Sequence, residues 1–269
     1  MNFSQALKYP FSDPQWIQKL AIAAGLSIGA LLQTAANFVP NDAQSLAIVL
    51  KGIGLVLLLI ASPFTAGYMF RAARNAAHGE LLPDWDDWGG LFTDGIRVIG
   101  MYLGYFLPVF VLYAVGMFIF VTVIIGGVSA AGGHGGIGES LFALGIIGYL
   151  ASFGLLLVMC LAVGFFCIPA YCLLLREGSS LGECFQIGKI WQIITNNFGS
   201  IMMFEVYAFV LSLISGLLTL CTCGLGQIVA QAFTMMVSAA LFAQLAQILM
   251  PGALDFDEGY GEIPDYNYQ

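Results

Sequence analysis

Residues 141–175 read LFALGIIGYLASFGLLLVMCLAVGFFCIPAYCLLL, a run of 35 residues without one charged side chain. The hydrocarbon core of a bilayer is roughly 30 Å thick, and a helix needs about 20 apolar residues to cross it. The segment is therefore long enough to span a membrane. Its excess length predicts tilt, a kink at Pro169 or extension beyond the bilayer.

Five further apolar stretches have the length of a membrane span. They run from about Leu20 to Val39, Leu46 to Phe70, Ile96 to Val123, Phe198 to Leu220 and Ile228 to Met250. Long segments of alternating hydrophobicity, which a membrane β-barrel needs, do not occur. The sequence therefore predicts an all-α integral membrane protein with about six transmembrane helices, in a single polytopic domain over residues 1–250.

The composition supports the same class. Of the 269 residues, 59% are hydrophobic and 9% are charged, whereas soluble domains carry about 25% charged residues. So few charges cannot cover a soluble protein of this size, which excludes a cytosolic enzyme. The net charge of −8 and the scatter of the basic residues also argue against nucleic-acid binding.

The basic residues predict the orientation in the membrane. They are Lys8, Lys19, Lys51, Arg71, Arg74, Arg97, Arg176 and Lys189. With six spans in succession, seven of these eight fall on one side, and only Lys51 falls on the other. Because cytoplasmic loops carry the excess of Lys and Arg, we expect a cell-membrane protein with both termini in the cytoplasm. Residues 251–269 would form a flexible, acidic, tyrosine-containing cytoplasmic tail, or a segment that docks on a partner.

Two polar stretches predict helices that lie in the cytoplasmic membrane interface. At about 100° per residue, one face of the first stretch carries Trp85, Trp88, Phe92 and Ile96, and the opposite face carries Asp86, Asp87 and Asp94. Such a helix turns its aromatic face towards lipid and its acidic face towards water. The second stretch, Ser180 to Gln192, is less polar.

The order of span, arginine, amphipathic stretch and span occurs twice. Pro63, Tyr68 and Arg71 close the second span, as Pro169, Tyr171 and Arg176 close the fourth. One interpretation is a parallel internal repeat with halves 1–125 and 141–250. Chance resemblance between hydrophobic helices is the other.

One segment carries a resemblance to a known family. Gly67-Tyr68-x-x-Arg71 is followed by Leu82-Pro83-x-Trp85-Asp86-Asp87-Trp88-Gly89-x-Leu91-Phe92-x-Asp94-Gly95. The pattern resembles an uncharacterised family of bacterial and archaeal multi-pass membrane proteins, described only as a domain of unknown function. The stretch after Arg176 resembles, more generally, the membrane domains attached to glycerophosphodiester phosphodiesterases, without their catalytic domain. The resemblance implies a fold and no activity, so no catalytic residue carries over.

The acidic residues of this motif have two interpretations. Asp84, Asp86, Asp87 and Asp94 could hold a divalent cation or act as paired carboxylates, although no histidine stands at helical spacing to them. The favoured interpretation is structural: the aspartates pair with Arg71, Arg74 and Arg97, and Asp84 caps a helix that starts after Pro83. We expect a structural and interfacial motif made of Tyr68, Arg71, Arg74, Pro83, Asp84, Trp85, Asp86, Asp87, Trp88, Phe92, Asp94 and Gly95, with no metal ligand.

Glu205 and Gln231 are candidates for a polar site inside the membrane. Glu205 lies about seven residues into the fifth span, where an ionisable group predicts function by default. It is either a proton or cation site or an ion-pair partner for Arg176 or Lys189. Gln231 belongs to a row with Gln227, Gln244 and Gln247 that would line a polar path or form hydrogen bonds between helices.

No phosphate-binding loop, H-E-x-x-H or C-x-x-C motif occurs in the sequence. The six cysteines show no metal-ligand spacing, so buried thiols are expected. We therefore expect a protein that is not an enzyme, has no cofactor, and organises membrane lipids or protein partners, as a homo-oligomer or with a second protein. The alternative is a small transporter or channel that uses Glu205 and the glutamines of the sixth span.

Overall fold

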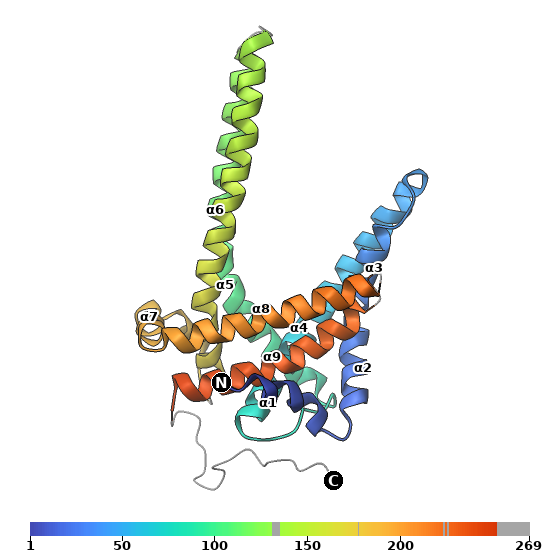
Figure 1. The fold of residues 1–269 in the computed structure, drawn as a ribbon, viewed down its shortest axis with the longest axis vertical. Coiled ribbons are helices and arrows are strands. Elements are labelled where there is room, and N and C mark those ends of the chain that lie inside the picture. The colour runs from blue at the N-terminus through green and yellow to red at the C-terminus, as the bar shows by residue number, and fades with distance from the viewer. Residues whose placement is uncertain (131–134, 177, 223, 225, 252–269) are drawn as a thin grey trace. The chain divides into compact units, whose positions relative to one another are not determined.

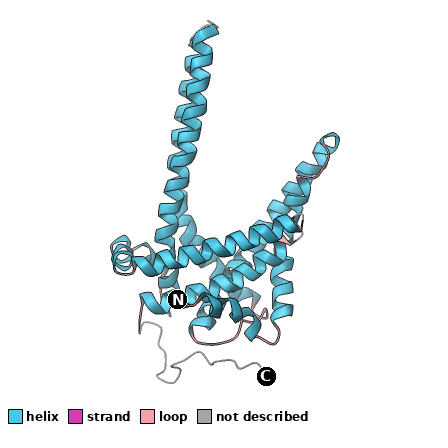
Figure 2. Ribbon diagram, viewed as in Figure 1, coloured by secondary structure: helices cyan, strands magenta, loops and turns pink. Residues whose placement is uncertain are grey.

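The computed structural model is 86% helical, and it has no strand among the residues that it describes, namely 1–130, 135–176, 178–222, 224 and 226–251 (Figures 1 and 2). The elements follow in the order α1 (Phe3–Lys8), η1 (Tyr9–Ser12), α2 (Trp16–Leu26), α3 (Ile28–Ala36), η2 (Asn41–Ala43), α4 (Gln44–Ala77), α5 (Trp88–Ala130), α6 (Gly135–Leu175), η3 (Leu181–Phe185), α7 (Ile187–Asn196), α8 (Phe198–Cys221) and α9 (Gln227–Leu249). The predicted tail lies outside the described residues, apart from Pro251.

Within the described part of the chain, five helices are long and apolar enough to cross a membrane, and a sixth span is added if α2 and α3 count as one. These five are 41–77, 88–122, 151–175, 198–221 and 227–249. The structure therefore confirms the all-α membrane fold. It also confirms that helices cover the second to sixth predicted spans.

The first predicted span is not one straight helix. The sequence predicts a continuous segment from Leu20 to Val39, but α2 and α3 meet at Ser27 with a bend of 47°. The buried Ser27 hydroxyl donates a hydrogen bond to the Ala23 carbonyl at 3.2 Å. A serine that bonds back to the preceding turn competes with the regular helix and favours bending.

The chain forms two compact units, of which the smaller is Gly100–Ile168. It contains the C-terminal part of α5 and the N-terminal part of α6. These segments approach closely, because a Cβ atom at Gly148 would overlap the Phe120 ring. In this part of the chain, α5 continues to Ala130 and α6 begins at Gly135.

The larger unit, Met1–Ile99 with Pro169–Gln269, is built around α9. This helix contacts α1, α2, α3, α4 and α8, and it lies beside α8 in Figure 1. Small side chains such as Ala239, Ala243 and Ala246 are almost fully buried on it. Small residues let helix backbones approach closely, which stabilises packing in lipid.

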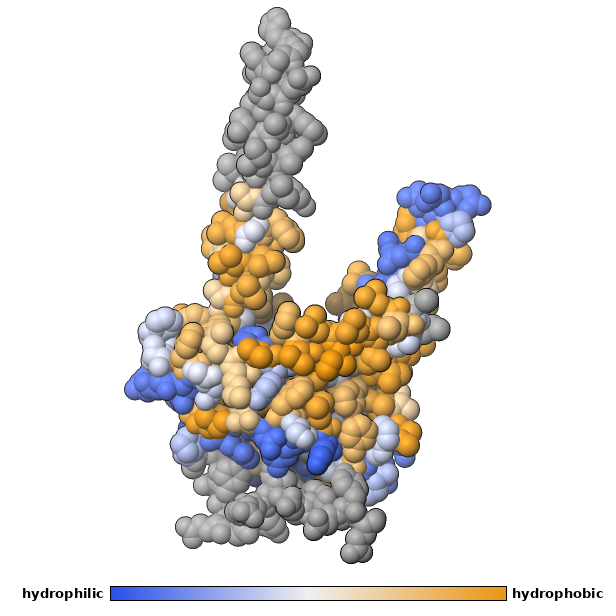
Figure 3. All heavy atoms as spheres, viewed as in Figure 1, coloured by the Kyte–Doolittle hydropathy of each residue, from blue (hydrophilic) through white to orange (hydrophobic). Residues whose placement is uncertain are grey.

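The outer faces of the span helices are apolar and exposed. Leu59 on α4 and Phe209 on α8 are more than half exposed, as lipid-facing side chains are expected to be. Figure 3 shows hydrophobic surface over α8 and hydrophilic side chains at the α3–α4 turn. This surface fits a bilayer as the surrounding solvent.

Candidate functional site

Polar groups from three segments meet around Lys19 of α2. The Lys19 ammonium lies 2.7 Å from Asp13 Oδ2 and 2.7 Å from Asp84 Oδ1, and it donates to the Leu82 carbonyl at 2.7 Å. The side chains of Lys19 and Asp13 are only 7% and 3% exposed, whereas that of Asp84 is 66% exposed. The three donors of the ammonium are thus matched by three acceptors. The arrangement ties the loop between α4 and α5 to α2.

A second ionic cluster forms around Arg71 of α4. Arg71 Nε donates to Asp94 Oδ2 at 2.8 Å, and one terminal nitrogen donates to Asp87 Oδ2 at 2.9 Å. The planar guanidinium therefore joins α4 to the loop and to the first turns of α5. Charge-assisted bonds of this kind are the stronger class of hydrogen bond.

Asp87 also caps α5. Its Oδ1 accepts a hydrogen bond from the Gly90 N–H at 2.9 Å, which satisfies one of the unpaired donors at a helix start. The predicted cap at Asp84 is wrong, because α5 begins at Trp88 and Asp84 instead pairs with Lys19. The Gly90 hydrogen bond and, next, the Arg71 ion pair hold the pKa of the Asp87 carboxyl below its ordinary value.

Two glycines of the motif allow α4 and the start of α5 to touch. A Cβ atom at Gly67 would overlap the Leu91 carbonyl, and one at Gly95 would overlap the Pro63 carbonyl. Any larger residue would separate the two helices. This contact holds Arg71 within reach of Asp94.

The aromatic residues of the motif divide into a buried pair and an exposed face. Tyr68 and Trp85 stack with ring centroids 4.0 Å apart and an interplanar angle of 4°. Trp85 is only 8% exposed, so its predicted place on a lipid-facing helix is wrong. Its segment is a loop that folds back over α4, and the Tyr68 ring covers it. Trp88, Phe92 and Ile96 are each more than 40% exposed along α5, as predicted.

The Tyr68 hydroxyl and the Trp85 indole nitrogen are buried without a hydrogen-bond partner among the described residues. Of the remaining motif residues, Pro83 is buried, and Asp86 is exposed and accepts from the Asp87 N–H at 2.9 Å. The guanidinium carbon Cζ of Arg74 lies 5.8 Å from the centroid of the Phe70 ring. In the described part of the chain, no three His, Cys, Asp or Glu side chains gather as a metal ion would require.

A family model described as "Protein of unknown function (DUF4013)" matches residues 50–224. The chain belongs to this family. No curated protein and no solved structure matches the chain. The DUF4013 match begins within α4 and ends after α8, so it contains the Arg71 cluster and leaves Lys19, Asp13 and α9 outside.

The second polar stretch of the DUF4013 region forms η3 and the amphipathic helix α7. Ile190 and Ile194 of α7 are buried, whereas Ile187 and Trp191 are 64% and 56% exposed. Lys189 Nζ lies 4.0 Å from Glu183 Oε2 of η3. Burial raises the pKa of the neighbouring Cys184 thiol to about 11. A discrete amphipathic helix therefore exists here, whereas the first stretch is a loop followed by the start of α5.

Glu205 lies half-buried in α8 and makes no ion pair or hydrogen bond with any described residue. Of its two expected partners, Lys189 lies beside Glu183 and Arg176 is exposed after the end of α6. Gln231 is exposed on α9.

The other glutamines of α9 contact three different segments. Gln227 accepts from the Thr34 hydroxyl at 2.8 Å, Gln244 exchanges two hydrogen bonds with the Asn2 backbone, and Gln247 donates to the Ala77 carbonyl at 3.0 Å. These bonds tie α9 to α3, α1 and the end of α4.

The Lys19–Asp13 pair was not expected as part of the site, because Lys19 contributed only to the predicted orientation. A lysine and an aspartate six residues apart beside a long apolar segment are nevertheless a signal of pairing. Their shared partner Asp84 stands far away in the sequence, and only the folded chain brings the three together.

Proposed function

We propose that this DUF4013 protein is a non-enzymatic organiser of the cell membrane, which binds lipid or partner proteins through its cytoplasmic face. Both termini lie in the cytoplasm, and the protein assembles as a homo-oligomer or with a second protein. The bias of the basic residues supports this orientation. In this orientation, the Lys19 and Arg71 clusters and α7 lie on the cytoplasmic side.

The observation that carries the proposal is the exposed apolar edge of α7. At about 100° per residue, Ile190 and Ile194 point to one side of the helix and are buried, while Ile187 and Trp191 continue the apolar arc and remain exposed. Lys189 and Gln192 lie on the polar side. A helix with this pattern inserts its exposed apolar edge at the boundary between headgroups and acyl chains, or into a partner's groove.

The ionic clusters support a structural role for the acidic motif. Asp13, Asp84, Asp87 and Asp94 all lie against Lys19 or Arg71. Carboxylates engaged in this way stabilise the loop and are poor candidates for acid–base chemistry. We therefore assign the motif to positioning the cytoplasmic face.

Native mass spectrometry of protein extracted gently from its own membrane tests the proposal. The double variant Ile187→Ser/Trp191→Ala should retain less lipid or partner than the wild type. Phe209→Ala, at an equally exposed apolar position within α8, is the matched control and should keep it. Equal retention in both variants would overturn the role of α7.

Glu205 supports a second candidate, a small transporter or channel. An acidic side chain without a partner in the described residues, inside a candidate span, is the kind of group that proton and cation pathways use. Proteoliposome flux that Glu205→Gln abolishes would favour this function. Flux that survives Glu205→Gln would exclude this residue as its site.

A further inference from the structure

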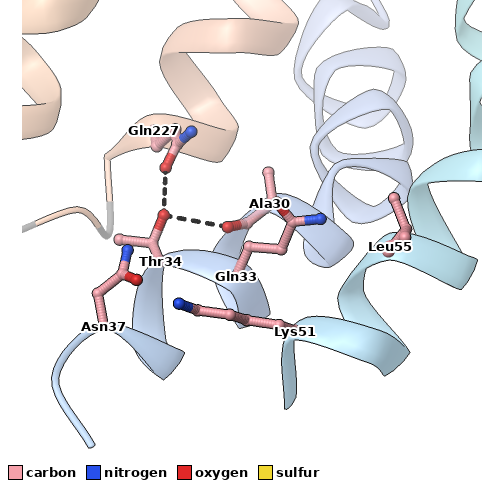
Figure 4. Close-up of a pocket in the computed structure, with 7 residues that line it drawn as sticks. All are labelled: Ala30, Gln33, Thr34, Asn37, Lys51, Leu55 and Gln227. Atoms are coloured by element: carbon pink, nitrogen blue, oxygen red, sulfur yellow. Dashed lines mark hydrogen bonds between the residues drawn. The ribbon is translucent and has the colours of Figure 1, made fainter. Parts of the chain in front are cut away.

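A polar cavity opens between α3, α4 and α9, far along α4 from the Arg71 cluster. Its volume is about 550 Å³, within the range of about 300–1,000 Å³ typical of small-molecule sites. The lining residues are Ala30, Gln33, Thr34, Asn37, Lys51, Leu55 and Gln227 (Figure 4). Such a polar lining is unusual for helices whose other faces are apolar.

The lining carries one charge, the ammonium of Lys51, and no carboxylate. In Figure 4 the Lys51 side chain extends across the cavity towards Thr34 and Asn37. Thr34 is already engaged, because its single O–H lies 2.8 Å from Gln227 Oε1 and 3.0 Å from the Ala30 carbonyl oxygen, either of which accepts from it. By contrast, the side chains of Lys51, Gln33 and Asn37 make no hydrogen bond or ion pair with any residue that the structure describes. Three sets of donors around one cavity are thus left for a ligand.

The position of Lys51 along α4 sets the depth of the cavity in the bilayer. Lys51 and Arg71 stand 20 residues apart on this helix, which is about 30 Å at 1.5 Å per residue. This length equals the hydrocarbon thickness of a bilayer. If Arg71 lies at one interface, Lys51 lies at the headgroup level of the opposite leaflet. Leu55 lies one turn deeper and is 53% exposed, and acyl chains would surround a side chain at that depth.

We propose that this cavity binds the phosphate of an anionic phospholipid headgroup. Lys51 pairs with the phosphate, the amide groups of Gln33 and Asn37 donate to its oxygens, and Leu55 contacts the apolar part of the lipid. A free phosphate ester would offer the same anionic oxygens. The cavity opens at headgroup depth beside lipid-facing leucine side chains, so we assign the lipid as the occupant. This site is separate from α7, and its test is independent of the proposed function.

The test uses the full chain in detergent micelles containing phosphatidylcholine, to which phosphatidylglycerol is added. Native mass spectrometry then counts the phosphatidylglycerol that each protein retains. Lys51→Gln should weaken retention about tenfold, the size expected for the loss of a charge-assisted bond. Lys51→Arg should retain phosphatidylglycerol as the wild type does, because a guanidinium also binds phosphate. Lys8→Gln, which removes an exposed charge outside the cavity, should change nothing.

A second variant and a second ligand keep the outcome clear. Asn37→Ala removes a donor at an exposed position after the end of α3, and it should weaken phosphatidylglycerol retention without changing the thermal midpoint. Unaltered retention in both Lys51→Gln and Asn37→Ala would overturn the proposal. If glycerol phosphate in solution binds in a Lys51-dependent manner and phosphatidylglycerol does not, the lipid assignment is overturned in favour of a soluble phosphate ester.

Discussion

The Lys19 ammonium lies 2.7 Å from the Asp13 carboxylate, with both side chains almost fully buried. A buried charge that loses its partner is expensive, whereas an exposed one is hydrated by water. The pair therefore fixes α2 to the segment before it. It also holds Asp84, which belongs to the loop after α4.

Removal of Lys19 should be the most damaging change in this cluster. Lys19→Met leaves Asp13 buried without its cation, and we expect it to lower the free energy of unfolding by about 3–5 kcal/mol. Asp84→Asn removes a largely exposed partner and should cost less than about 1 kcal/mol. Thermal and denaturant unfolding of the purified protein in one detergent compares the two. Equal losses would show that the Lys19–Asp13 contact does not govern stability here.

The capping carboxylate of Asp87 should make the protein sensitive to acid. Its pKa in the folded chain lies below the ordinary value of 3.8, so its stabilising contribution is complete above that pH. The contribution is lost as the pH falls through the lowered pKa. The thermal midpoints of the wild type and Asp87→Asn should therefore differ at neutral pH and converge in strong acid. A gap that stays constant down to the lowest pH would contradict this assignment.

The Tyr68–Trp85 stack should tolerate loss of the hydroxyl and not loss of the indole. Because the Tyr68 hydroxyl has no partner among the described residues, Tyr68→Phe should be neutral or stabilising in an unfolding measurement. Trp85→Ala removes a buried ring and should cost about 3–5 kcal/mol. A marked loss in Tyr68→Phe would reveal a hydrogen bond to water or to a ligand at this hydroxyl.

The contact between α4 and α5 has no room for one more methyl group, so adding one should lower the stability of the fold. Gly95→Ala places a Cβ against the Pro63 carbonyl, and such overpacking typically costs about 1–3 kcal/mol. Gly100→Ala, on the same helix, meets no atom within 4 Å and should be neutral or slightly stabilising, since alanine favours the helix. Thermal midpoints of both variants decide the matter, and equal midpoints would mean that the helices can separate at Gly95 without penalty.

Sequence alone located the second to sixth spans because membrane insertion depends on a local quantity, the apolar length of a segment. It also placed Trp88, Phe92 and Ile96 on an exposed face, since they follow one another at helical spacing. The bend at Ser27 was missed because a hydropathy pattern records the apolar length of a segment and not a local break in the helix.

The tertiary structure decided which side chains contact one another. The periodicity of the motif placed Trp85 on a helix with Trp88, yet the loop before α5 folds back and buries Trp85 on Tyr68. In the same way, Asp84 pairs with Lys19 and leaves the cap to Asp87. The cavity around Lys51 likewise needs α9 beside α3 and α4. Spacing along the chain determines which residues can share a helix face. Only long-range packing determines which distant side chains pair with a buried charge such as Lys19.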